Sequence, residues 1–161
     1  MLFANKIPTP DNSIDKSKIL DETLLANALG RLLTSSSIKT NRVVLGLNSS
    51  HTMLKTVTFP KMPHKELERM LDFAINELFN FPEGQDAKDF SYSFEILNEA
   101  KNEMDLLIVA CPLDMINSYL NVLRQVDLVP FIIDVGAFTL PRVSESNLRS
   151  CYVDLGHSQT I

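Results

Sequence analysis

The feature that most constrains the fold is a repeated switch of hydrophobic period between residues 53 and 135. Residues 64–79 and 113–126 place apolar side chains every three to four positions, which predicts two amphipathic helices. Four shorter segments are apolar or alternate between apolar and polar side chains, which predicts strands: 53–59, 90–96, 106–111 and 129–135. The resulting order, strand–helix–strand–strand–helix–strand, is that of a ferredoxin-like βαββαβ module.

Within this module the sequence also predicts how its parts pack. The second and third strands are joined by a polar turn at 98–103, so we expect them to form an antiparallel hairpin. We expect the helix over 64–79 to dock on a four-stranded sheet through one stripe of side chains: Leu67, Leu71, Ala74 and Leu78.

The segments that flank the module indicate a second structural unit. Asp21 is placed to cap a helix over 22–33, and the β-branched run at 42–47 predicts a buried strand. Residues 151–155 predict a last strand, after which the sequence runs only to Ile161. The chain is therefore expected to have a mixed α+β (α/β) fold.

Charge and composition exclude several classes of protein. The 161 residues carry a net charge of −5, with no basic stripe, which argues against a nucleic-acid partner. No apolar run approaches the ~20 residues that span a bilayer, and no secretory signal is visible, so we expect a soluble, intracellular protein. The five glycines are too dispersed for a Walker loop or a GxGxxG motif.

Residues able to carry out catalysis or bind metals do not cluster in the sequence. The three histidines, His51, His64 and His157, have no second metal ligand at helical or strand spacing. Cys111 and Cys151 show no CxxC pattern and are expected to be reduced thiols. We therefore expect no catalytic residues, no metal site and no enzymatic activity.

One turn near the end of the sequence could contact a phosphate. An apolar strand ends at Asp154 and is followed by Gly156 and Ser158, which could direct main-chain N–H groups and a hydroxyl toward an anion. The same residues are equally typical of a plain β-hairpin turn. From the residues alone, both interpretations stay open.

Three stretches together resemble one protein family. They are Val43–His51, then Phe59–Pro63 with the helix that ends Phe79-Asn80-Phe81-Pro82, and Val129–Phe138 with Val153–Gly156. The combination resembles the type IV pilus assembly proteins of the PilM family, relatives of FtsA with an actin-like ATPase fold. The chain departs from the family pattern at Ala74-Ile75-Asn76, where a Glu-rich stretch is usual, and at Asn80, where proline is usual.

The resemblance implies a domain organisation. Residues 1–50 would form part of an actin-like subdomain, and 51–135 an inserted, ferredoxin-like (SHS2-like) βαββαβ subdomain. Residues 136–161 would return to the actin-like subdomain and stop within it, so the chain would be an N-terminal fragment. In the intact family fold ATP and Mg²⁺ lie between two phosphate loops. Asp154, Gly156 and Ser158 would belong to the second loop only, so we expect no tight ATP binding and no cofactor in this fragment.

The resemblance also implies a function. The chain would be a cytoplasmic scaffold of type IV pilus assembly, or of a related competence or secretion machine. It would bind the N-terminal peptide of a PilN-like bitopic inner-membrane protein and so lie peripheral to that membrane. The implied groove residues, which would serve equally as hinge and core residues, are Leu47, Asn48, Ser49, Pro60, Phe81 and Pro82.

A second interpretation belongs to a different class of protein. The βαββαβ module could be a free-standing regulatory domain that binds a small effector or homodimerises through its sheet. In that case residues 1–40 would pack on the sheet as an ordinary helix.

Overall fold

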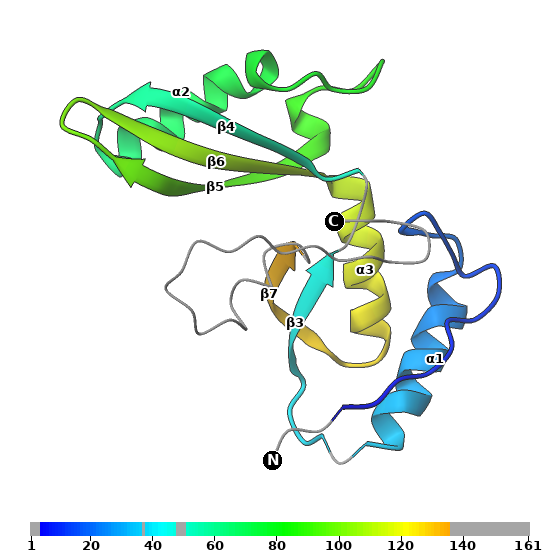
Figure 1. Ribbon diagram of the computed structural model, residues 1–161. Helices are drawn as coiled ribbons and strands as arrows, with labels where there is room; N and C mark the ends of the chain where they lie inside the picture. The colour runs from blue at the N-terminus through cyan, green and yellow to red at the C-terminus, as the bar shows by residue number, and fades with distance from the viewer. Residues whose placement is uncertain (1–3, 37, 48–50, 136–161) are drawn as a thin grey trace. The chain divides into compact units, whose positions relative to one another are not determined.

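The computed structural model describes residues 4–36, 38–47 and 51–135. The chain divides into two compact units, Met1–Ser49 with Leu120–Ile161, and Ser50–Tyr119. Figure 1 shows the elements of both. The second unit lies within the sequence of the first, so it is an insertion in the chain.

The second unit is a three-stranded antiparallel sheet with one long helix on it (Figure 1). Its strands are β4 (Met53–Pro60), β5 (Phe90–Glu99) and β6 (Glu103–Pro112), and their order is β4-β6-β5. The helix α2 covers His64–Leu78, and a short 3₁₀ turn, η1 (Ala87–Asp89), precedes β5. The predicted hairpin is confirmed, and it is longer than expected because β5 and β6 each span 10 residues.

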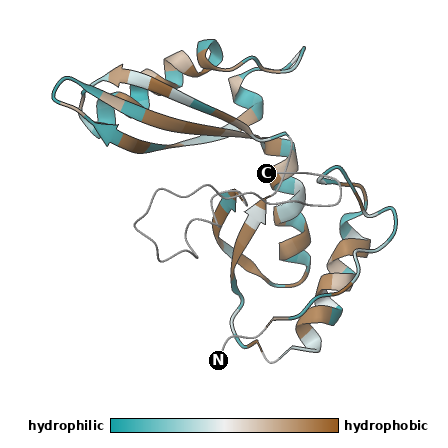
Figure 2. Ribbon diagram, in the orientation of Figure 1, coloured by the Kyte–Doolittle hydropathy of each residue, from teal (hydrophilic) through white to brown (hydrophobic). Residues whose placement is uncertain are grey.

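The core of this unit lies between α2 and one face of the sheet. Leu67, Leu71 and Ile75 point from α2 into this core and are at most 2% exposed. Alternate residues of the central strand β6 meet them: Met104, Leu106, Ile108 and Ala110. Figure 2 shows apolar and polar residues alternating along these strands. Ile75 lies in the core, whereas Ala74 and Leu78, which we expected there, are only half-buried.

The expected fourth strand does not join this sheet. β7 (Val129–Val135) pairs in parallel with β3 (Arg42–Leu47), in the first unit. The prediction of a four-stranded βαββαβ module over 51–135 is therefore wrong in its last strand. Both β3 and β7 are near-continuous apolar runs, which is typical of parallel pairs. Such runs reveal a strand but not its partner, so periodicity could not distinguish the two sheets.

The first unit contains further strands and helices besides this parallel pair. Its remaining elements are β1 (Ile14–Asp15), β2 (Lys18–Ile19), α1 (Glu22–Thr34) and the end of α3 (Leu113–Gln125), which begins in the second unit. The carboxylate of Asp21 caps α1 by accepting a 2.8 Å hydrogen bond from the N–H of Leu24. A Cβ atom added at Gly30 would lie 3.6 Å from the Cγ1 atom of Val126, an ordinary van der Waals distance, so α1 lies close to the segment just after α3.

Candidate partner-binding site

The residues Phe79–Phe90 connect α2 to β5, and we call them the aromatic loop. The helix ends because Phe79 adopts an extended backbone (φ −115°, ψ 142°) while its N–H still donates to the carbonyl of Ile75. The ring of Phe81 lies 6.0 Å from that of Phe79 and 4.7 Å from that of Phe90. Phe79 and Phe90 are buried, whereas Phe81 is half-buried. Phe81 therefore presents part of an aromatic cluster to the surface.

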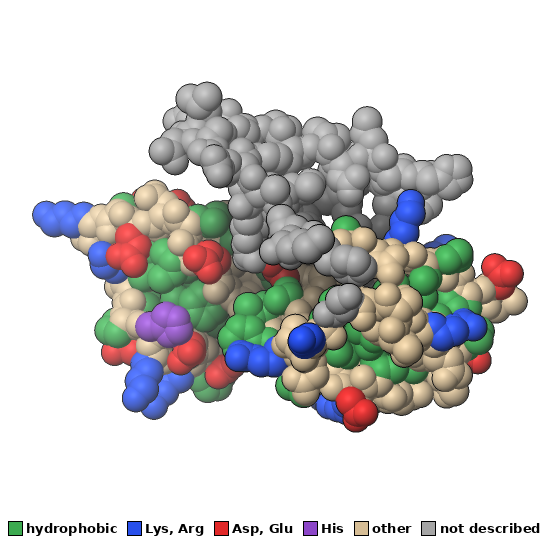
Figure 3. All heavy atoms as spheres, turned by 90° about the horizontal axis from the view of Figure 1, so that it is seen from below, with side chains coloured by type: hydrophobic (Ala, Val, Ile, Leu, Met, Phe, Trp, Pro, Cys, Tyr) green, Lys and Arg blue, Asp and Glu red, His purple; other side chains and the backbone are tan. Residues whose placement is uncertain are grey.

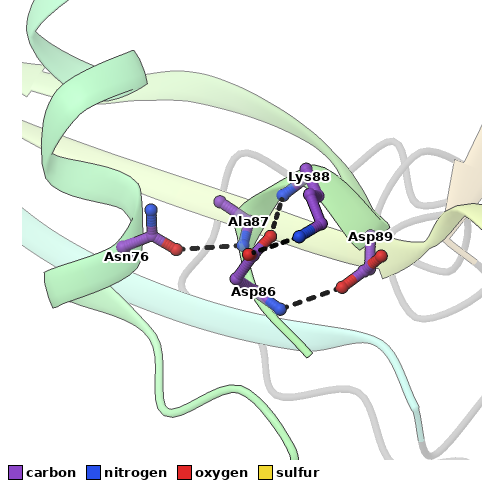
Figure 4. Close-up of polar contacts among 5 residues, drawn as sticks. All are labelled: Asn76, Asp86, Ala87, Lys88 and Asp89. Carbon is purple, nitrogen blue, oxygen red and sulfur yellow. Dashed lines mark hydrogen bonds and ion pairs between the residues drawn. The ribbon is translucent and has the colours of Figure 1, made fainter. Parts of the chain in front are cut away.

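The middle of the aromatic loop is a tight turn followed by η1. Gly84 has a φ of +81°, a conformation that residues with a side chain rarely adopt. Gln85 closes the turn by donating its N–H to the carbonyl of Pro82 at 3.0 Å. Asp86 then caps η1, because its carboxylate accepts from the N–H of Lys88 while Asp89 accepts from the N–H of Asp86 (Figure 4).

A side chain of α2 holds the aromatic loop in place. The N–H of Ala87 donates a 2.9 Å hydrogen bond to the Oδ1 atom of Asn76, as Figure 4 shows. The loop is therefore held by main-chain contacts at its middle as well as by the rings near its ends. Such a loop loses little conformational freedom when it binds a partner.

The ionic groups of the loop are exposed. The ammonium of Lys88 lies 3.0 Å from Asp86, which keeps the pKa of the Asp86 carboxyl below its ordinary value and raises the pKa of Lys88. An exposed pair of this kind contributes little to stability. It helps to shape the turn and does not create a reactive group.

The structure separates two of the residues that we expected to share a groove. Pro60 is paired with Glu103 at the beginning of β6, while Phe90, which touches Phe81, is paired with Pro112 at its end. The 10 residues of β6 extend over about 30 Å. Within this unit Pro60 is thus at the opposite end of the sheet from Phe81. The reason is that α2 starts just after Pro60 and runs the length of the sheet before the aromatic loop begins.

The other expected groove residues lie in different parts of the chain. Leu47, the last residue of β3, is only 3% exposed and belongs to the core of the first unit. Pro82 is exposed beside Phe81 in the aromatic loop. Asn48 and Ser49 lie outside the described residues, as do Asp154, Gly156 and Ser158 of the expected phosphate turn.

A polar depression of about 480 Å³ lies beside α2 and was not expected from the sequence. Its lining residues are His64, Glu68, Asp72, Tyr92, Ser93 and Phe94. The hydroxyl of Tyr92 donates to Asp72, and partial burial together with this carboxylate raises the pKa of Tyr92 to about 12. The spacing of His64, Glu68 and Asp72, one helical turn apart, is the signal that could have revealed it.

The described residues include one free cysteine, Cys111. The thiol of Cys111 is buried, and burial raises its pKa, which keeps it protonated and unreactive near neutral pH. Across residues 4–36, 38–47 and 51–135, no three His, Cys, Asp or Glu side chains are grouped so as to hold a metal ion. In Figure 3, lysine and arginine side chains on the visible coloured face are scattered among other residues and form no continuous stripe.

Comparison with known protein families finds a family model that matches the chain. A family model described as "Type IV pilus assembly protein PilM" matches residues 3–161, nearly the whole sequence. The chain belongs to the PilM family. The three stretches that suggested this family in the sequence therefore indicated it correctly, and the mixed α+β fold class is confirmed.

The fold has a counterpart among solved structures of this family. A chain of a "PilM-PilN type IV pilus biogenesis complex" superposes with a TM-score of 0.72 at 23% sequence identity. The match covers 82% of this chain and 39% of that chain, so this PilM-family chain spans well under half of the solved relative's length. At this level of identity the likeness shows the fold alone.

A second solved structure is a weaker match. The cytoplasmic domain of EpsL, an inner-membrane component of the type II secretion system of Vibrio cholerae, matches with 20% identity and a TM-score of 0.44. It covers 68% of this chain and 42% of that chain, and we base no argument on it. A search of curated proteins finds no significant match. Among the described residues, no helix of this PilM-family chain is long and apolar enough to cross a membrane.

Proposed function

We propose that the chain is a scaffold component of type IV pilus assembly that binds the N-terminal peptide of a PilN-like bitopic inner-membrane protein. The observation that carries this proposal is the PilM family match over residues 3–161. The solved relative with the same fold is named for its complex with PilN, which supports a partner of this type. Through that partner the chain would be held at the cytoplasmic face of the inner membrane.

The aromatic loop supplies a surface suited to such a peptide. Aromatic side chains that are backed by a packed cluster contribute a disproportionate share of binding energy at interfaces. Phe81 fits this description, because Phe90 and Phe79 support one side of its ring and the rest is exposed. The bond from Ala87 to Asn76 keeps the loop in shape before a partner arrives. A peptide would then gain a hydrophobic contact with Phe81 and Pro82.

In this proposal the chain acts by binding and does not catalyse a reaction. Its contribution would be to fix a membrane-anchored partner in position within the assembly machine. A nucleotide would bind to a longer protein of the family, with Asp154, Gly156 and Ser158 contributing one of the two phosphate loops.

The test is a titration of the 161-residue chain with a fluorescent N-terminal peptide of a PilN-like protein, read by anisotropy. We expect Phe81→Ala to weaken binding by about 1–3 kcal/mol, or roughly fivefold to 150-fold. Pro60→Ala is the control, since Pro60 is exposed and lies at the other end of the sheet. It should leave the affinity unchanged.

Two results would contradict the proposal. If the folded chain binds the peptide no better than a scrambled peptide of the same composition, it is not a receptor for that partner. If Phe81→Ala binds the peptide as tightly as the unmodified chain does, the aromatic loop is not the contact surface. A circular dichroism spectrum of each variant establishes that it is folded.

A further inference from the structure

The polar depression between α2 and β5 has an acidic wall and an aromatic wall. Glu68 and Asp72, both exposed, contribute carboxylates from α2. The rings of Tyr92 and Phe94, both half-buried, come from β5 on the other side. Among the described residues that line the depression there is no lysine or arginine. The depression therefore carries negative charge that its own lining does not balance with a permanent cation.

The two carboxylates have contacts within the chain that leave oxygen atoms available. The Nδ1 atom of His64 lies 3.5 Å from Oε1 of Glu68, and the hydroxyl of Tyr92 donates to Oδ1 of Asp72. No lysine or arginine of the described residues forms an ion pair with either carboxylate. Since a carboxylate accepts hydrogen bonds through both oxygens, the second oxygen of each can still receive a donor.

This combination of groups suits a guanidinium or an ammonium ion. Residues four apart on a helix have Cβ atoms about 6 Å apart, so one bound cation can reach both Glu68 and Asp72. The faces of aromatic rings attract cations as well. The ring of Phe94 is held in place by the imidazole of His64, with 5.2 Å between the ring centroids. An anionic side chain would be repelled by the carboxylates.

The depression continues the surface that the aromatic loop begins. Phe90 supports Phe81, and Tyr92 and Phe94 follow on the same strand and pack against the same core. They lie two and four residues beyond Phe90, or roughly 7 and 13 Å along an extended strand. Among the described strands β5 pairs with β6 alone, so its outer edge is open to an extended peptide.

We propose, building on the function proposed above, that this depression binds an arginine or lysine side chain of the peptide whose hydrophobic residue contacts Phe81. Cytoplasmic segments that border a membrane span are enriched in lysine and arginine, which makes them complementary to the acidic wall. Because the peptide precedes the span, its basic residue follows the residue on Phe81, by about two to four positions. The aromatic loop then anchors the peptide, and the depression sets its direction.

The experiment titrates the full 161-residue chain with two fluorescent peptides, read by anisotropy. One is the natural N-terminal segment of a PilN-like protein up to its membrane span. In the other, every lysine and arginine is replaced by glutamine. We expect the natural peptide to bind roughly threefold to tenfold more tightly at low salt. This difference should shrink as salt is added, because salt screens exposed charges.

Two variants with the same change in net charge locate the effect. Glu68→Gln combined with Asp72→Asn removes both carboxylates but keeps an acceptor for the hydroxyl of Tyr92, and it should bind the two peptides nearly equally. Glu66→Gln combined with Glu77→Gln is the matched control, because both residues are exposed on α2 and neither lines the depression. It should keep the difference between the peptides. A circular dichroism spectrum of each variant checks that it is folded.

Two results would overturn this proposal and leave the proposed function standing. One is equal binding of the two peptides by the unmodified chain. The other is a control variant that loses the difference as fully as the depression variant does, which would show general charge attraction. In both cases Phe81→Ala would still weaken binding. If neither peptide binds better than its scrambled version, the proposed function fails, and the basic-residue site fails with it.

Discussion

The Oδ1 atom of Asn76, in the last turn of α2, accepts a 2.9 Å hydrogen bond from the N–H of Ala87, which lies in η1 (Figure 4). This bond links a helix to a loop eleven positions further along the chain. Asn76→Ala removes the acceptor and leaves the N–H to water. We expect the free energy of unfolding to fall by about 0.5–1.5 kcal/mol in urea denaturation. Asn80→Ala, an exposed change nearby, should have a smaller effect, and equal losses would show that the bond is unimportant.

The core of the second unit should not tolerate a charge. Leu71 is 0% exposed, so Leu71→Asp would bury an unpaired carboxylate against β6. We expect a loss of about 4 kcal/mol or more, measured by chemical denaturation. Lys65→Asp, on the exposed side of the same helix, is the matched control. If the two midpoints shift equally, α2 does not pack as described.

The turn in the aromatic loop should require glycine. Gly84 has a φ of +81°, and a Cβ atom at this position would meet nothing within 4 Å. The penalty of Gly84→Ala therefore comes from the backbone conformation alone, about 1–2 kcal/mol. Gly46→Ala, where there is also open space but no positive φ, should change stability much less. Thermal melts of the two variants give the comparison.

The pKa of Tyr92 predicts an alkaline limit to stability. It is raised to about 12 from an ordinary value of 10.0, because burial and the Asp72 carboxylate both disfavour the phenolate. In the unfolded chain Tyr92 ionises near pH 10, so its stabilising effect is fully present below that pH. The effect is lost as the pH rises from about 10 to 12. Tyr92→Phe should flatten this part of the stability curve. Absorbance of tyrosinate should show a smaller late-titrating fraction in the variant, in which Tyr119, whose pKa is also raised by burial, remains.

The sequence predicted those parts of the fold that depend on local residue patterns. The period of α2 and the alternation of β5 are local, and both elements were found close to their true bounds. The partner of β7 is not local, and an apolar run carries no information about which strand it joins. The stripe of α2 was placed slightly off, because Ile75 rather than Ala74 faces the sheet.

The sequence says less about the arrangement of the candidate site than about the fold. Phe81 was identified from a family motif, but its support by Phe79 and Phe90 depends on how a loop closes onto a strand. Pro60 and Phe81 lie at opposite ends of the sheet because α2, a helix of 15 residues, separates them, and sequence motifs do not report such a separation. The polar depression beside α2 combines residues of α2 with residues of β5, and no local pattern connects the two.

The parallel pairing of Arg42 with Val129 has a consequence for how the chain is made. β3 leaves the ribosome before the inserted unit does. It therefore cannot pair with β7 until the whole inserted unit has been synthesised. That unit has all of its strand partners within Ser50–Tyr119, so it can fold while β3 is still unpaired. Folding of the inserted unit brings the ends of the long segment between β3 and β7 closer together. Less conformational entropy is then lost when these two strands pair. We therefore expect the insertion to fold first during synthesis and its host unit second.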